Sequence, residues 1–283
     1  MSVLWPTVTI VGVGLIGGSA GLALARRGLT KQIIGVGRSA ASLAAAQDCG
    51  AITSATTDLA AAVAAADFVL VATRVGLIGE QLDQIDAAVR PGTLVTDAGS
   101  TKQSIVAGWE RSRATRRGRF VGSHPLAGSH RRGPQAAAAD LFNGRLAVLT
   151  PAAETPRADV EAVAKFWTAI GADTTELPPA EHDQLLAAAS HTPHLVAAAL
   201  AAATPAAARP LTAGGWRDTT RVAAGDPDLW TDILLDNSTA VAGQLDAVAA
   251  VIDQLRQAIA AGDRSTLTHL LAQAKESRDA LGS

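Results

Sequence analysis

This chain of 283 residues has no tyrosine and only one cysteine, Cys49. One cysteine excludes an internal disulfide and any metal site made of several thiolates, and it is typical of the reducing cytoplasm. The formal net charge of −2 argues against broad binding of nucleic acid, because phosphate contacts need a concentrated positive face. We therefore expect a cytoplasmic protein that has a small-molecule ligand and no metal, nucleic-acid or membrane partner.

Charge is also missing from the first 25 residues, which are followed by Arg26 and Arg27 and so superficially resemble a signal peptide or a membrane span. No positive segment precedes this apolar stretch, as a signal peptide requires. We expect no later run of about 18 apolar residues either. The glycines within the first stretch indicate a different use, as a tight turn.

These glycines lie between an expected strand and an expected helix. Residues 7–12, TVTIVG, form a β-branched run typical of a buried parallel strand, and a helix-forming run continues after the glycines to Arg27. Gly12, Gly14 and Gly17 form the pattern G-x-G-x-x-G, which lets the backbone approach a pyrophosphate at a helix N-terminus. The sequence therefore predicts a dinucleotide site formed by Gly12, Gly14, Leu15, Ile16 and Gly17.

The second expected strand indicates which dinucleotide binds. It begins at Gln32, and the position where an NAD site usually has Asp or Glu is Gly37, followed by Arg38 and Ser39. A missing carboxylate and an added guanidinium suit the 2′-phosphate of NADP, so we expect NADP to be favoured over NAD. The alternative is that Arg38 stacks on adenine and that both cofactors are accepted.

Three further runs have the composition of strands: DFVLVAT (67–73), GTLVTDAGS (92–100) and RLAVLTP (145–151). Helical segments lie between them, which predicts an α/β fold with a Rossmann-type, doubly wound parallel sheet. Ligands of such sheets bind at the carboxyl ends of the strands. Thr73, Ser100 and a loop at residues 122–130 should therefore surround one crevice.

The β pattern stops after residues 173–179, and long alanine- and leucine-rich helices are expected from Ala180 onward. Apolar residues recur every three or four positions from Pro227 to about Ala261, which predicts one helix of about 50 Å. Such a length favours a homodimer formed through an all-α C-terminal part, with an intrachain bundle as the alternative. The expected domains are residues 1–178 for the dinucleotide and 179–283 for substrate and dimerisation, with no regulatory domain.

Five motifs, in their order along the chain, resemble one known family. They are VGVGLIGGS (11–19), TDAGSTK (96–102), GSHPLAGS (122–129), AEHDQLLAAASHTPH (180–194) and GGWRDTTRVAAGDPDLWTDILLDN (214–237). Together they are similar to the prephenate and arogenate dehydrogenases of tyrosine biosynthesis. The resemblance implies hydride transfer from the hydroxyl-bearing ring carbon to a nicotinamide, with loss of carbon dioxide and aromatisation. The product is 4-hydroxyphenylpyruvate from prephenate, or tyrosine from arogenate.

The resemblance implies catalytic roles for two residues. His124 matches the family's catalytic histidine, and neutral imidazole is a suitable base for the hydroxyl proton near physiological pH. Ser100 matches a serine that hydrogen-bonds near the hydroxyl group and the nicotinamide. Thr73 is expected beside the cofactor, as are Arg38 and Ser39.

Other residues match the family's substrate pocket. A planar guanidinium is the best fixed partner for a carboxylate, and Arg221 matches the arginine with that task. The remaining residues implied in substrate binding are Ser129, Ser190, His191, His194, Asp218 and Trp230. Trp230 matches a tryptophan near the pocket that the other subunit can contribute, and the alternative is that it anchors the interface between subunits. His182 and Asp183 also match, and we expect them to support the fold or the cofactor rather than the chemistry.

Two departures from the family bear on the substrate. The run His130 to Arg132 stands where many relatives have an acidic residue and a lysine, and Arg74 stands where relatives commonly have proline. The added positive charge favours prephenate, a dicarboxylate, over arogenate, whose amino group would be repelled. His130 is a candidate for substrate tuning or gating, and the alternative is that it is a solvated residue of the loop. A preference for NADP points instead to arogenate, because the arogenate enzymes of this family often use NADP. On the charge argument prephenate is the first choice, with arogenate or both substrates as the alternative.

Two other classes of protein share part of the pattern. The β-hydroxyacid and 6-phosphogluconate dehydrogenases also place a Rossmann domain before a helical one, but they use a lysine base in the helical half, where this chain has only Lys275. A non-enzymatic NADP-binding sensor would keep the glycine loop without needing Ser100, His124 and Arg221 together. The prephenate-type enzyme is therefore the favoured hypothesis.

Overall fold

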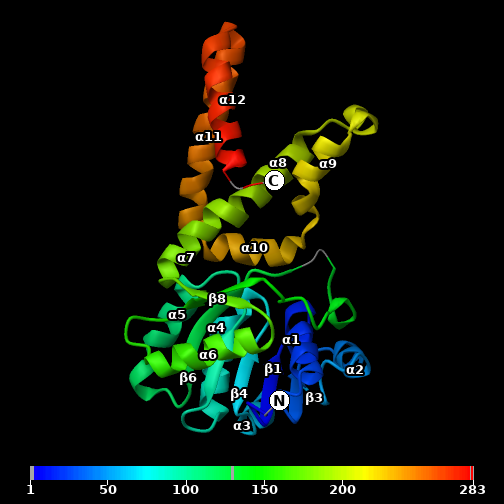
Figure 1. Ribbon diagram of the computed structural model, residues 1–283, viewed down its shortest axis with the longest axis vertical. Coiled ribbons are helices and arrows are strands. Elements are labelled where there is room, and N and C mark those ends of the chain that lie inside the picture. Colours follow the sequence, from blue (N-terminus) through cyan, green and yellow to red (C-terminus); the bar gives the residue numbers. More distant parts are fainter. Residues whose placement is uncertain (1–2, 129–130, 281, 283) are drawn as a thin grey trace.

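In the computed structural model, which covers residues 3–128, 131–280 and 282, the chain forms a sheet-containing half and a helical half (Figure 1). The strands are β1 (Thr7–Val11), β2 (Gln32–Val36), β3 (Ser54–Thr56), β4 (Phe68–Val71), β5 (Leu94–Asp97), β6 (Arg119–Pro125), β7 (Leu146–Thr150) and β8 (Asp173–Glu176). The helices of the first half are α1 (Leu15–Arg26), α2 (Ala40–Asp48), α3 (Leu59–Ala64), α4 (Val75–Ala88), α5 (Gln103–Glu110) and α6 (Arg157–Ala169). The second half contains α7 (Pro179–Leu186), the π-helical turn η3 (Ala187–His191), α8 (Thr192–Ala203), α9 (Gly214–Thr220), the short turn η5 (Arg221–Ala224), α10 (Pro227–Asp236), α11 (Ser238–Ala261) and α12 (Arg264–Asp279).

The strands form one eight-stranded sheet in the order β3-β2-β1-β4-β5-β6-β7-β8. Neighbouring strands are parallel, which confirms the predicted Rossmann-type sheet, except that β7 runs antiparallel to β6. The expectation of a parallel strand at residues 145–151 is therefore wrong in direction. A parallel neighbour needs a crossover connection, and between β6 and β7 the described residues form only the short turn η2 (Pro134–Ala136).

Helices cover both faces of the sheet (Figure 1). Successive residues of a strand point to opposite faces, so a central strand such as β1 contributes to two cores. One buried cluster joins Val8 and Ile10 of β1 to residues of α1, α2 and α6, and the other joins Val11 to residues of α3, α4 and α5. This two-sided core aligns the carboxyl ends of β1, β4 and β5 along one edge, where the segments that follow them meet.

Strand β6 is longer than the sequence indicates. Residues 122–130 are expected to form a loop, whereas β6 continues to Pro125 and pairs His124 with Val148 of β7. The antiparallel neighbour supplies the hydrogen bonds that keep this segment extended. His124 therefore lies on a strand, which holds its backbone in place.

The helical half begins with a continuous run formed by α7, η3 and α8. Pro193 has no N–H group and its ring would clash with the carbonyl of Ala189, which explains why the helix widens into a π turn just before it. Residues Pro179–Ala203 are long and apolar enough to cross a membrane by length and composition, so the expectation of no later apolar run is wrong. The run packs against α5, α11 and β7, and it contains buried His182 and Asp183, which are unusual in a helix that faces lipid.

The single helix expected from Pro227 to about Ala261 is two helices, α10 and α11, which run in different directions (Figure 1). The corner is Asn237, a buried residue with φ −104° and ψ 28°. Its side-chain amide donates to the backbone carbonyl of Asp183 at 2.7 Å and lies 3.1 Å from Nδ1 of His191. These contacts hold the corner, so that α10 lies against α4 of the sheet-containing half.

Gly17 and Gly14 allow the predicted roles of the glycines to be tested separately. A Cβ at Gly17 would lie 2.0 Å from the carbonyl oxygen of Gly12, whereas a Cβ at Gly14 would meet no atom within 4 Å. We expect Gly17→Ala to lower the free energy of unfolding by about 1–3 kcal/mol, as overpacking does, and Gly14→Ala to change it by less than about 0.5 kcal/mol. Urea unfolding measures both effects, and equal destabilisation by the two substitutions would contradict the close approach of β1 and α1.

Candidate active site

A cavity of 770 Å³ lies where the carboxyl ends of the strands meet the helical half. The segments that follow β1, β4 and β5 and the end of β6 line it from one side, and η3 and α10 line it from the other. Its polar lining includes Thr73, Ser100, His124, Ser190 and His191. The structure thus brings Thr73, Ser100 and His124 together around one crevice.

His124 belongs to a chain of three hydrogen-bonded side chains that crosses from one half of the molecule to the other. Its Nδ1 lies 3.0 Å from Nε2 of His182, and Nδ1 of His182 lies 2.7 Å from Oδ1 of Asp183. His182 and Asp183 are buried on α7. His182 therefore contacts the candidate base directly and Asp183 acts on it through His182, a closer role than the general support of the fold or the cofactor that the sequence suggests.

The carboxylate at the end of this chain determines which nitrogen of each ring carries a proton. Asp183 accepts hydrogen bonds from the backbone N–H groups of Lys102 and Gln103, at 2.8 and 2.9 Å. An ionised carboxylate only accepts, so Nδ1 of His182 donates to it. With both rings neutral, Nε2 of His182 is an acceptor and Nδ1 of His124 is a donor. Nε2 of His124 keeps a free lone pair, as a general base requires.

The surroundings of His124 keep its ring unprotonated. Burial is the largest cause that lowers the pKa of His124 well below its usual value. The neighbouring groups of His182, Lys102 and His191 lower this pKa further. At physiological pH the ring is therefore neutral and able to accept a proton.

Helix α10 forms one wall of the cavity, and arginines of the other half hold it. Arg132 forms an ion pair with Asp226, the residue that caps the N-terminus of α10. Arg74 lies 3.8 Å from Asp228 and 3.7 Å from Asp232. Both arginines line the cavity, so they bring positive charge to it while they connect the two halves.

Ser190, His191 and Trp230, which the family resemblance assigns to the substrate pocket, all line the cavity. His194 lies behind Trp230, with the two rings stacked at a centroid distance of 3.6 Å. Burial lowers the pKa of His191 to about 4 and lowers that of His194 as well. The two rings are therefore neutral at physiological pH, and His191, which lines the cavity, offers a substrate a polar contact without added charge.

Arg221 and Asp218 do not lie with these residues. They are exposed on η5 and α9, which form an arm with α8 (Figure 1), and neither is among the residues that line the cavity in this chain. Their part in substrate binding stays a prediction. Ser129 and His130 lie outside the described residues.

The N-terminus of α1 opens into the same cavity through Gly14, Leu15 and Ile16. Gly14 is the N-cap residue and has no side chain, so the first N–H groups of α1 have no side-chain cap. Gly12 has a φ of 94°, in the left-handed region that favours glycine, and Gly17 packs on β1 rather than facing the cavity. Open N–H groups, the positive end of the helix dipole and the space above Gly14 together fit the pyrophosphate of a dinucleotide.

The residues expected at the far end of the dinucleotide lie at the carboxyl end of β2. Arg38 and Ser39 are exposed there, and the hydroxyl of Ser39 accepts from the N–H of Ser42 at 3.2 Å as the cap of α2. Thr73 lines the cavity and its hydroxyl donates to Oε1 of Gln81 at 2.5 Å. Gly37 precedes Arg38, so the usual carboxylate of an NAD site is replaced by a glycine.

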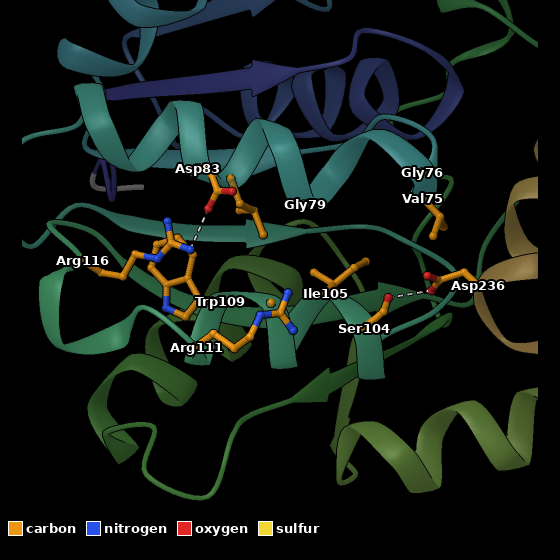
Figure 2. Close-up of a pocket in the computed structure, with 12 residues that line it drawn as sticks. Val75, Gly76, Gly79, Asp83, Ser104, Ile105, Trp109, Arg111, Arg116 and Asp236 are labelled. Atoms are coloured by element: carbon orange, nitrogen blue, oxygen red, sulfur yellow. Dashed lines mark hydrogen bonds and ion pairs between the residues drawn. The ribbon is translucent and has the colours of Figure 1, made fainter.

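A smaller hollow of 250 Å³ lies between α4 and α5 (Figure 2). An ion pair between Arg116 and Asp83, at 2.7 Å, lies at one end, and Ser104 donates to Asp236 at 2.8 Å at the other. None of the predicted site residues lines this hollow. In residues 3–128, 131–280 and 282, no group of three or more His, Cys, Asp or Glu side chains is arranged to hold a metal ion.

Comparisons with known proteins cover both halves of the chain. The family model described as "Prephenate dehydrogenase, nucleotide-binding domain" matches residues 20–176, and the model described as "Prephenate dehydrogenase, dimerization domain" matches residues 178–273. The prephenate dehydrogenase of Bacillus subtilis is 35% identical over 289 residues, which cover 99% of this chain and 77% of that protein. The cyclohexadienyl dehydrogenase of Zymomonas mobilis is 33% identical, over 97% of this chain and 95% of that protein.

A solved structure is similar over the full length of the chain. It is the prephenate dehydrogenase from A. aeolicus in complex with hydroxyphenyl propionate and NAD+, which superposes with a TM-score of 0.90 at 29% identity. The similarity covers 99% of this chain and 100% of that one. The order of the sheet-containing and helical halves is therefore shared between the two proteins.

Proposed function

Because the chain belongs to the prephenate dehydrogenase family and is a nicotinamide-dependent oxidoreductase, we propose that it oxidises and decarboxylates prephenate to 4-hydroxyphenylpyruvate. One observation carries the proposal. The open N-terminus of α1, Ser100 and the unprotonated ring of His124 line a single cavity. A cofactor and a ring hydroxyl bound there would lie next to a base.

The residues of the cavity account for the proton steps of this reaction. Nε2 of His124 would accept the proton of the ring hydroxyl as the carbon–oxygen bond becomes a carbonyl, while Ser100 holds the oxygen by a hydrogen bond. A nicotinamide dinucleotide held at the N-terminus of α1 would supply the acceptor for the hydride that leaves the same ring carbon. The bond to the ring carboxylate then breaks, carbon dioxide leaves, and its electron pair completes the aromatic ring. His124 returns its proton to the oxygen, which becomes the phenol, so the base is regenerated.

Prephenate is the substrate that the charge of the cavity favours. Arg74, Arg131 and Arg132 line it together with one carboxylate, Asp226, so positive groups are in excess, and guanidinium groups bind carboxylates better than any other side chain does. Prephenate carries two carboxylates, whereas arogenate carries an ammonium group that these arginines would repel. Arogenate, or both substrates, is the alternative, since one relative is named for the wider cyclohexadienyl activity.

NADP is the cofactor that we propose to be favoured. Arg38 is exposed at the carboxyl end of β2, where it suits a 2′-phosphate, and Gly37 offers no carboxylate to the ribose hydroxyls. The A. aeolicus structure contains NAD+, and this is a property of that protein. Use of both cofactors is the alternative.

His124→Asn tests the proposed chemistry, because asparagine cannot accept the hydroxyl proton. With the wild-type protein, we expect the highest kcat/KM for prephenate with NADP+ among the four pairings of prephenate or arogenate with NADP+ or NAD+. His124→Asn should lower kcat by about 10²–10⁴-fold. The absorbance of the reduced nicotinamide measures all of these rates.

His269→Asn is the matched control for this assay, because His269 is exposed on α12 outside the cavity, and it should keep the wild-type kcat. No turnover in any of the four pairings would refute the proposed function. A higher kcat/KM for arogenate would replace prephenate by the alternative substrate.

We also propose that the protein is a homodimer held by its helical half. The matching family model is described as a dimerization domain, and α10 to α12 expose apolar side chains that a partner would cover: Leu235, Val251, Ile252, Ile259 and Leu271. Only Val241 and Ala258 of α11 are buried within this chain, although α11 is 24 residues long, or about 36 Å. A second copy is the partner that this exposed surface suits.

Ile252→Glu tests the dimer, because it puts a charge on the apolar stripe of α11. Light scattering should give twice the chain mass of 28.7 kDa for the wild type and a value shifted toward 28.7 kDa for Ile252→Glu. Gln257→Glu adds the same charge to α11 at an exposed position that is not three or four residues from Val251, Ile252 or Ile259, and it should leave the mass unchanged. A wild-type mass of 28.7 kDa at micromolar concentration would contradict the dimer.

A further inference from the structure

Lys102 has no exposed surface, yet none of the chemistry above uses its side chain. A lysine is almost never fully buried unless its ammonium group is paired. Here Nζ donates to Oδ2 of Asp97, which is equally buried, and at 3.0 Å to the carbonyl oxygen of Ser123. Apolar residues of similar volume are often as stable as a buried ion pair or more so, which indicates a role for this pair other than stability.

The ion pair holds the strand segment next to the candidate base. Ser123 precedes His124 on β6, and its N–H donates to Oδ1 of Asp97 at 3.0 Å. Its carbonyl accepts from Lys102, so both backbone groups of Ser123 are bound to the pair. The carbonyl of Ser123 belongs to the peptide unit that leads into His124, so the pair fixes the backbone from which the imidazole extends.

The backbone of the same lysine holds the other end of the hydrogen-bond chain. Lys102 is the N-cap residue of α5, and its own side chain makes no cap because an ammonium group donates hydrogen bonds and cannot accept them. Asp183 of the helical half takes that place and accepts from the N–H groups of Lys102 and Gln103. The carboxylate that orients His182 is thereby fixed to the segment that follows β5.

We propose that Lys102 is a positioning residue for His124: its ammonium group holds the strand segment that carries the imidazole, and its backbone N–H holds the carboxylate that orients the imidazole through His182. Lys102 does not line the cavity, so it acts through these residues and not on the substrate. The inference rests on the proposed function only for the measurements of kcat and KM, because the NMR titration and the unfolding measurement need no substrate.

The charge of Lys102 gives the positioning a measurable signature. The titratable groups that face His124 are Lys102 and its partner Asp97 from the sheet-containing half, and His182, Asp183 and His191 from the helical half. The Lys102 charge lowers the pKa of His124, whereas burial lowers the pKa of Lys102 itself and Asp97 opposes that effect. Removing the ammonium group should therefore raise the pKa of His124, and the acidic limb of kcat/KM should move to higher pH.

The test uses the double variant Lys102→Met/Asp97→Asn, which removes both charges at once and leaves no unpaired buried ion. Lys102→Met alone is made beside it, and Lys165→Met, at an exposed position on α6, is the control for the loss of one lysine. The titration of the His124 imidazole is followed by NMR, with His124→Asn identifying its signals. The pH profile of kcat/KM and urea unfolding are measured on the same proteins.

In the double variant we expect a folded protein, a His124 titration moved to higher pH than in the wild type, and a kcat lowered by about 10–100-fold with a nearly unchanged KM. Lys165→Met should match the wild type in every measurement. A folded double variant with the wild-type His124 titration and the wild-type kcat would overturn the proposal.

A double variant that cannot fold would also overturn the proposal, because it would assign Lys102 to the fold. Should the wild-type protein turn over neither substrate, the proposed function would fail. The NMR titration would still decide the role of Lys102 in that case, because it needs no turnover.

Discussion

The hydrogen bond between His124 and His182 is the contact on which the rest of the site depends. The sheet-containing half places the imidazole at the edge of the sheet, but the carboxylate that orients it, Asp183, comes from the helical half. The same carboxylate binds the first N–H groups of α5. One side chain, Asp183, therefore takes part both in the docking of the two halves and in the choice of the His124 nitrogen that is left to accept a proton.

Polar contacts surround this bond and give the docking a definite geometry. The corner at Asn237 binds the backbone of Asp183, and the preceding Asp236 accepts from Thr101 and Ser104 at 2.6 and 2.8 Å. Arg74 adds ion pairs to α10. Hydrogen bonds and ion pairs are directional, whereas apolar contacts tolerate sliding. The cavity between the halves thus has walls at fixed positions, which a hydride transfer needs because its reacting atoms must meet at close range.

Features that depend on local patterns could be predicted from the sequence, and those that depend on distant partners could not. The strand-glycine-helix order at Gly12 to Gly17 and the change from strands to helices are local, and the structure contains both. The direction of β7 depends on the connection that precedes it. The link between His124 and His182 joins residues 58 positions apart, which no spacing rule reveals.

Two of the missed features did leave a local signal. Asn237 is a weak helix former inside an apolar repeat, and it marks the corner between α10 and α11. Pro193 marks the π turn that lies just before it.

The central claim, that the helical half holds His124 as a base with a free Nε2, is tested most directly by ¹⁵N NMR of the histidine rings at neutral pH. The account predicts a proton on Nδ1 and none on Nε2 for both His124 and His182; a proton on Nε2 of His124 would contradict it.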